Sequence, residues 1–152
     1  MIRAVVGAGP RVGTSFVMHS LMEAGLPVHS DPAVSGVLPP EGNVDGYYET
    51  HYTDLPYLKD VICKVWPLGV NGADIERAVI LERNRPDQLA SIEKQMVRER
   101  ALLATLGCDW SAEEHLDRSM AALSPLYEIP HLRVRTEDLD DEIDNIINYM
   151  RY

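Results

Sequence analysis

The sequence predicts an α/β fold in which a parallel sheet of about four to five strands is flanked by helices. Three observations support this fold class. Short apolar runs of strand length alternate along the chain with segments of helical periodicity. The first apolar run, residues 2–7, does not alternate with polar positions, as expected for a strand that is covered on both faces. The first of them leads through a glycine-rich turn directly into a helical segment.

The first part of the chain supplies the opening strand and helix. Residues 2–7 are apolar without alternation, so we expect a central strand there. Residues 14–25 follow as a helix, with apolar positions at helical spacing and Gly25 as the stop signal. Residues 26–29 are a candidate second strand. Residues 30–60 are rich in proline and glycine, and we expect a long loop of the kind that is usually functional or mobile.

The rest of the chain continues the alternation with three strands and three helices. The expected strands lie at residues 61–66, 78–82 and 131–135. The expected helices run from Pro86 to about Leu106, from Ser111 to about Leu123, and over residues 137–150. Gly107 would end the first of these helices. Ser111 and Glu114 have the spacing of a capping box at the start of the second.

Length and composition indicate one domain, residues 1–152, with a substantial core. The chain has 152 residues, of which 45% are hydrophobic, and a domain of that size buries roughly two-thirds of its unfolded surface. The 14 Lys and Arg against 24 Asp and Glu give a formal net charge of −10, which argues against a general nucleic-acid binder. A single anionic cofactor stays compatible with this charge, because a few arginines aimed at phosphates act locally.

Other sequence patterns bear on metals, membranes and location. No apolar stretch approaches the roughly 20 residues that a membrane span needs, and the first apolar run has no leader features. Cys63 and Cys108 lie far apart without paired Cys or His spacing, so we expect reduced thiols and neither a metal site nor a disulfide. We therefore expect a cytoplasmic protein, and no pattern indicates an oligomeric state.

Residues 4–16 have the pattern of a phosphate-binding loop between a strand and a helix. Glycines let backbone N–H groups turn toward an anion, and the positive end of the following helix attracts its charge. Arg11 adds a full positive charge, while Thr14 and Ser15 add hydroxyl groups. The ATP-binding form of this loop, Gly-x-x-x-x-Gly-Lys-Ser/Thr, would place its first glycine at Ala8 and its lysine at Thr14. The pattern thus predicts a phosphate cradle without that lysine.

The string Pro-Arg-Val-Gly-Thr-Ser at residues 10–15 resembles the loop with which sulfotransferases grip the 5′-phosphosulfate of 3′-phosphoadenosine 5′-phosphosulfate (PAPS). A second segment strengthens the resemblance. The apolar run at 78–82 delivers Arg83, and Ser91 follows eight positions later, which is the spacing of the family's 3′-phosphate motif. Weaker similarities, at residues 43–49, 61–66 and 131–139, extend the match over almost the whole chain. The chain therefore resembles a short PAPS-dependent sulfotransferase with a P-loop NTPase-like three-layer sandwich.

The resemblance implies a set of cofactor-binding residues and a set of catalytic candidates. The residues implied to bind PAPS, or its product PAP, are Pro10, Arg11, Val12, Gly13, Thr14, Ser15, Arg83 and Ser91. Arg11 would stabilise the charge that grows on the bridging oxygen as the sulfuryl group leaves. A hydroxyl acceptor needs a general base, for which we select Glu49, with His51 and His29 as alternatives. Lys64 ends a buried strand and should face the cleft, toward phosphosulfate, acceptor or a nearby carboxylate.

Three functions remain open at this point. The first is transfer of a sulfuryl group from PAPS to a hydroxyl or amine of a small-molecule or glycan acceptor. The second is a small P-loop nucleotide kinase, against which stand the missing lysine and the pair Arg83 and Ser91. The third is a non-catalytic PAP- or PAPS-binding module, since the chain has no Arg-Lys-Gly loop of the kind that closes over the nucleotide in cytosolic sulfotransferases. In a purely structural role, Arg83 would pair with Glu82 or Asp87.

Overall fold

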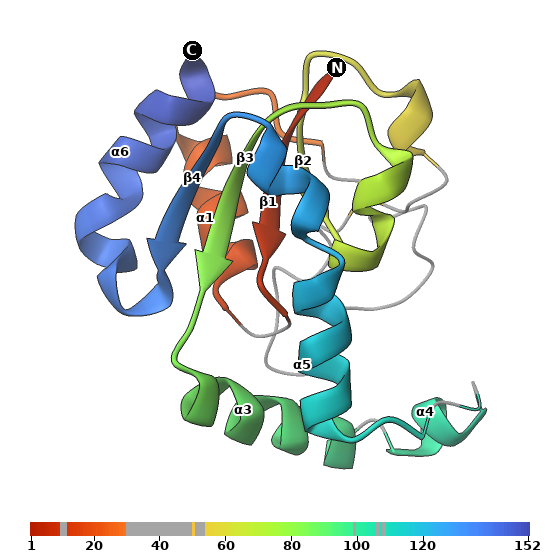
Figure 1. Cartoon of the computed structure of the whole chain (residues 1–152). Helices are drawn as coiled ribbons and strands as arrows, with labels where there is room; N and C mark the ends of the chain where they lie inside the picture. The colour runs from red at the N-terminus through yellow and green to blue at the C-terminus, as the bar shows by residue number, and fades with distance from the viewer. Residues whose placement is uncertain (10–11, 30–49, 51–53, 99, 106, 108) are drawn as a thin grey trace.

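The structure, a computed structural model, describes residues 1–9, 12–29, 50, 54–98, 100–105, 107 and 109–152 (Figure 1). It confirms the predicted fold class. Four parallel strands form one sheet in the order β2-β1-β3-β4, which makes β1 a central strand as expected. The strands are β1 (Ile2–Gly7), β2 (Ile62–Val65), β3 (Ile75–Glu82) and β4 (His131–Arg135).

Helices connect the strands and cover the sheet. The α-helices are α1 (Thr14–Glu23), α3 (Arg85–Arg98), α4 (Arg100–Thr105), α5 (Ala112–Ala121) and α6 (Leu139–Arg151). Short 3-10 segments are η2 (Leu55–Tyr57), η3 (Pro67–Gly72), η4 (Ser124–Glu128) and η5 (Thr136–Asp138). The predicted cap of α5 is present, since Ser111 Oγ accepts a hydrogen bond of 3.1 Å from the Glu114 backbone N–H.

Residues 26–29 do not form a strand, because only Val28 makes an isolated parallel bridge, to Ile62. Leu26 and Val28 instead pack beside the core that α1 covers, so this apolar run buries side chains without extending the sheet. The long helix expected from Pro86 to about Leu106 corresponds to α3 and α4, and residue 99 between them lies outside the described residues.

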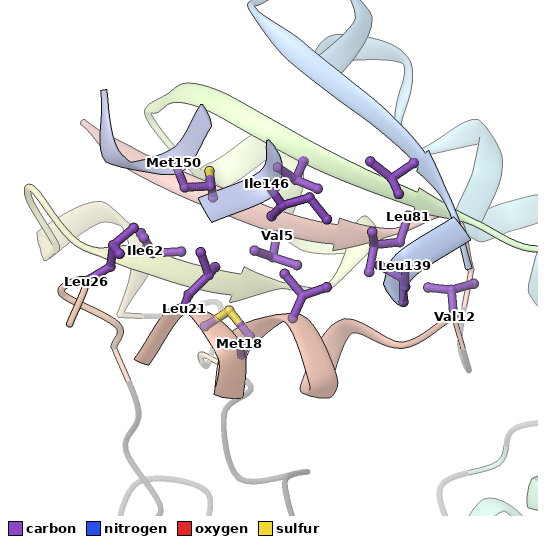
Figure 2. Close-up of a cluster of buried hydrophobic side chains, with 13 residues drawn as sticks. Val5, Val12, Met18, Leu21, Leu26, Ile62, Leu81, Leu139, Ile146 and Met150 are labelled. Atoms are coloured by element: carbon purple, nitrogen blue, oxygen red, sulfur yellow. The ribbon is translucent and has the colours of Figure 1, made fainter. Parts of the chain in front are cut away.

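The two faces of the sheet carry separate cores, because successive strand residues point to opposite sides. On one face, Val5 and Leu81 pack against Met18 of α1 and Ile146 of α6 (Figure 2). On the other face, Ala4, Val6 and Ile80 pack with apolar residues of η2, η3 and η4. Burial on both sides explains the apolar stretches of β1 and β3, whereas β4 has exposed arginines and buries only Val134.

The carboxyl ends of the strands are where α3 and α5 lie. In Figure 1 the strand arrows point toward α3, which lies beyond the end of β3. A third apolar cluster joins Ile92 of α3 to Ala112 and Leu116 of α5. In open parallel sheets of this kind, ligands bind at the carboxyl ends of the strands. The loops that follow β1, β2 and β3 are therefore where we expect a ligand to bind.

Candidate anion-binding site

The loops that follow β1 and β3 begin side by side. The two strands are neighbours, with Gly7 opposite Leu81, and the Ala8 backbone N–H donates to the Leu81 carbonyl at 2.7 Å. The glycine-rich loop starts at Ala8, and Arg83 stands two residues beyond Leu81. The structure thus brings the junctions that carry the two predicted phosphate motifs to the same edge of the sheet.

The described part of the glycine-rich loop has the backbone that a phosphate cradle needs. Gly9 and Gly13 have φ values of +98° and +95°, a region that residues with side chains rarely adopt. Gly13 is the N-cap of α1, and the helix begins at Thr14 as predicted. The structure describes all of α1, and its first turn carries no acidic side chain. Its backbone N–H groups and the positive end of its dipole are therefore suited to an anion.

Lys64 brings a positive charge to this loop from the neighbouring strand. It lies one residue before the end of β2 and is half-buried. Its Nζ donates a hydrogen bond of 3.1 Å to Ser15 Oγ in the first turn of α1. This contact directs Lys64 toward the start of α1, and its role toward phosphosulfate or an acceptor stays a prediction. An ammonium group from β2 therefore lies near the helix start, although the loop itself lacks the lysine of ATP-binding loops.

Arg83 and Ser91 belong to one strand–helix unit. Arg83 lies in the two-residue link between β3 and α3, Ser91 lies in the second turn of α3, and both are half-buried. Their shared role in binding one phosphate stays a prediction from the sequence.

Charged side chains lie around the Arg83 junction. Glu82, which precedes Arg83, forms an ion pair with Arg133, with its carboxylate 2.6 Å from Arg133 Nη2. The carboxyl of Glu137 has a lowered pKa, chiefly because the backbone N–H groups of Glu137 and Asn84 donate to it, with smaller contributions from the positive charges of Arg135 and Arg83. Arg83 is thus close enough to the exposed carboxylate of Glu137 to interact with it electrostatically.

Two polar side chains that the sequence did not single out hold the loop in place. Gln88 of α3 is only 2% exposed, and its Nε2 donates to the Ala8 carbonyl at 3.0 Å. The Thr136 hydroxyl lies 2.7 Å from the Val12 carbonyl oxygen and 3.1 Å from that of Glu82. A buried glutamine on the inner face of a helix is the one sequence signal that could have pointed to Gln88, since buried polar groups need partners.

Four of the predicted site residues lie outside the described residues: Pro10, Arg11, Glu49 and His51. Their roles stay predictions. The alternative base His29 is described, and its backbone N–H donates to the Ile62 carbonyl at 2.9 Å, at the amino end of β2. Lys64 and Ser15 meet near the opposite end of that strand, so the backbone position of His29 does not favour a role beside the cradle.

Comparisons with known proteins add no assignment to this geometry. No family model matches the sequence, and no curated protein matches it. Within the described residues, no group of three or more His, Cys, Asp or Glu side chains could hold a metal ion. In the same part of the chain, no helix has the length and apolar character needed to cross a bilayer.

Proposed function

We propose that this protein transfers a sulfuryl group from PAPS to a hydroxyl or amine of a small-molecule or glycan acceptor. The observation that carries the proposal is the meeting of two phosphate motifs at one edge of the sheet. The cradle that follows β1 and the Arg83 that follows β3 stand on neighbouring parallel strands, with Gly7 opposite Leu81. A second cationic position is what the 3′-phosphate of PAPS needs, and ATP would not require it.

The donor groups at this edge suit an anion with two separated charged ends. One end would face the backbone N–H groups at Gly13 to Ser15, with the Lys64 ammonium beside them. The other end would face the Arg83 guanidinium, with Ser91 as a hydroxyl partner. The net charge of −10 does not oppose this binding, because the cations act on the anion at short range.

The chain's own residues would assist the reaction mainly by stabilising charge. PAPS, when bound, supplies the activated sulfuryl group. Lys64 and the N–H groups of the cradle would attract the negative charge that increases on the departing phosphate, so they would stabilise the transition state more than the ground state. Arg11 is predicted to act in the same way. The proton of the acceptor would pass to a general base, for which Glu49 and His51 remain the candidates.

Thermal unfolding in the presence of nucleotides tests the proposal. PAP at about 100 times its Kd should stabilise the protein by about 2.7 kcal/mol, or about 5–10 °C for a chain of this length. ADP and ATP with Mg²⁺ should give much smaller shifts. Arg83→Ala should remove the advantage of PAP over AMP, since that advantage depends on the 3′-phosphate. Arg151→Ala, which removes the same charge at the far end of α6, is the control and should keep it.

The same measurements separate the competing functions. Equal shifts with PAP and AMP in the unmodified protein would refute the assignment of a 3′-phosphate site. A larger shift with ATP and Mg²⁺ than with PAP would favour a kinase. Binding of PAP without release of PAP from PAPS, in a mixture of alcohol and amine acceptors, would indicate a non-catalytic binding module. A cytoplasmic location stays a prediction from the sequence.

A further inference from the structure

Thr136 makes one contact to each of the two phosphate motifs. It begins η5, between β4 and α6, and its side chain is half-buried. Its Oγ1 lies 2.7 Å from the Val12 carbonyl oxygen and 3.1 Å from the Glu82 carbonyl oxygen. A hydroxyl group has a single proton to donate, so the two carbonyls share one donor.

Each of these carbonyls directly precedes a predicted phosphate-binding residue. Val12 precedes Gly13, the N-cap of α1, and Glu82 precedes Arg83. In a planar trans peptide unit the C=O and N–H groups point in opposite directions. Holding the Val12 carbonyl toward Thr136 therefore turns the Gly13 N–H away from it, and the same relation holds between Glu82 and the N–H of Arg83. One hydroxyl thus orients the backbone at the end of the cradle and at the Arg83 junction.

Apolar packing near Thr136 also fixes the position of the loop that carries Val12 and Gly13. Val12 is 1% exposed and belongs to the core cluster that includes Leu139. Figure 2 shows Val12 beside Leu139 at the end of this cluster. A Cβ built on Gly13 would come within 2.8 Å of Leu139 Cδ1 and 3.9 Å of Thr136 Cγ2. The cradle therefore ends against the β4–α6 connection. The hydroxyl of Thr136 lies where it can hold the loop after β1 and the loop after β3 in a fixed position relative to each other.

We propose that Thr136 is a positioning residue that holds the cradle and the Arg83 junction at the separation a two-ended anion requires. The inference rests on the proposed function, because that function supplies the ligand with two charged ends. A ligand that is anchored at one junction would then find the other already oriented. A nucleotide with a single phosphate would use only the cradle and would benefit less.

Two substitutions separate the hydroxyl from the shape of the side chain. Thr136→Val keeps the branched shape and removes the donor, whereas Thr136→Ser keeps the donor and removes the methyl group. We expect Thr136→Val to weaken PAP binding roughly tenfold, the size of effect that loss of one partly buried hydrogen-bond donor can produce, and AMP binding less than about threefold. The Thr136→Ser variant should bind PAP with an affinity within about threefold of that of the unmodified protein. Thr105→Val, at an exposed position of α4, is the control for the Thr-to-Val change.

Calorimetric titration measures these affinities, and a double-mutant cycle tests the coupling. In an Arg83→Ala background, Thr136→Val should weaken PAP binding no more than it weakens AMP binding, because the proposed site for the 3′-phosphate at Arg83 is already lost. Hydrogen exchange of the free protein adds a readout without nucleotide. Thr136→Val should speed exchange at residues 12–15 and at residues 82–84 together, and Thr136→Ser should not.

The outcomes distinguish this inference from the proposed function. Unchanged PAP affinity in Thr136→Val, an equal loss in Thr136→Ser, or faster exchange in only one of the two segments would overturn the role of Thr136. If the unmodified protein fails to prefer PAP over AMP, the proposed function is overturned. The exchange measurement then still decides the inference: faster exchange in both segments supports the link between the junctions, and any other pattern overturns it.

Discussion

Replacing Gly9 by alanine should destabilise the protein for two reasons that add. The φ of Gly9 is +98°, so any side chain would strain the backbone by roughly 1–2 kcal/mol. A Cβ there would also lie 2.4 Å from Leu116 Cδ1 and 2.6 Å from Gln88 Nε2, well inside contact distance. Overpacking of this kind typically costs about 1–3 kcal/mol. The sum is a loss of about 2–5 kcal/mol in the free energy of unfolding.

Gly25 provides a matched control for the backbone part of this effect. Its φ is +79°, but a Cβ at Gly25 would meet nothing within 4 Å. Gly25→Ala should therefore cost only the strain, about 1–2 kcal/mol. Urea unfolding of both variants measures the difference, which we expect to be about 1–3 kcal/mol with an unchanged m value.

A double substitution identifies the source of the crowding. Leu116 is 1% exposed, so Leu116→Ala alone should cost about 2–5 kcal/mol. In combination with Gly9→Ala it makes room for the new methyl group, and the double variant should lose less than the sum of the two single losses. Equal losses at Gly9 and Gly25, or strict additivity with Leu116→Ala, would refute the packing we describe under the cradle.

Two further predictions concern buried polar groups. Burial raises the pKa of the Cys63 thiol from 9.0 to about 11. Between these values the folded protein keeps a proton that the unfolded chain has lost, so the free energy of unfolding should fall as pH rises from 9 to 11, by at most about 1.4 kcal/mol per pH unit. Cys63→Ala should flatten this slope in urea unfolding at several pH values, and an identical slope would contradict the assignment. Gln88→Leu should cost about 1–3 kcal/mol, because it leaves the buried Ala8 carbonyl without its donor; calorimetric unfolding measures the loss, and an unchanged midpoint would show that this hydrogen bond is dispensable.

Local features of the structure could be predicted from the sequence. The bounds of β1 and β4 agree with the strands expected at residues 2–7 and 131–135, and α1 begins at Thr14 as the glycine-rich turn indicates. The Ser111 cap was also predicted. Each of these signals is contained in a few adjacent residues, because backbone preferences, capping and the period of apolar positions act over one or two turns.

The arrangement of the candidate site could not be predicted from such local signals alone. The sequence indicated that strands precede the cradle and Arg83, but only the strand order made β1 and β3 neighbours. The strand predicted at residues 26–29 was wrong. A short apolar segment can bury its side chains without joining a sheet, as this one does. The prediction that Lys64 faces the cleft followed from the cost of burying its charge, but the identity of its partner did not.

The sequence by itself determined most of the element types, the apolar faces and the glycine-rich turn for which we predict anion binding. The tertiary structure decided which side chains support that turn. Lys64 meets Ser15 across 49 residues, Gln88 meets Ala8 across 80, and Thr136 meets Val12 across 124. No local preference encodes such contacts, because they exist only after the sheet has ordered its strands and its helices have packed onto both faces.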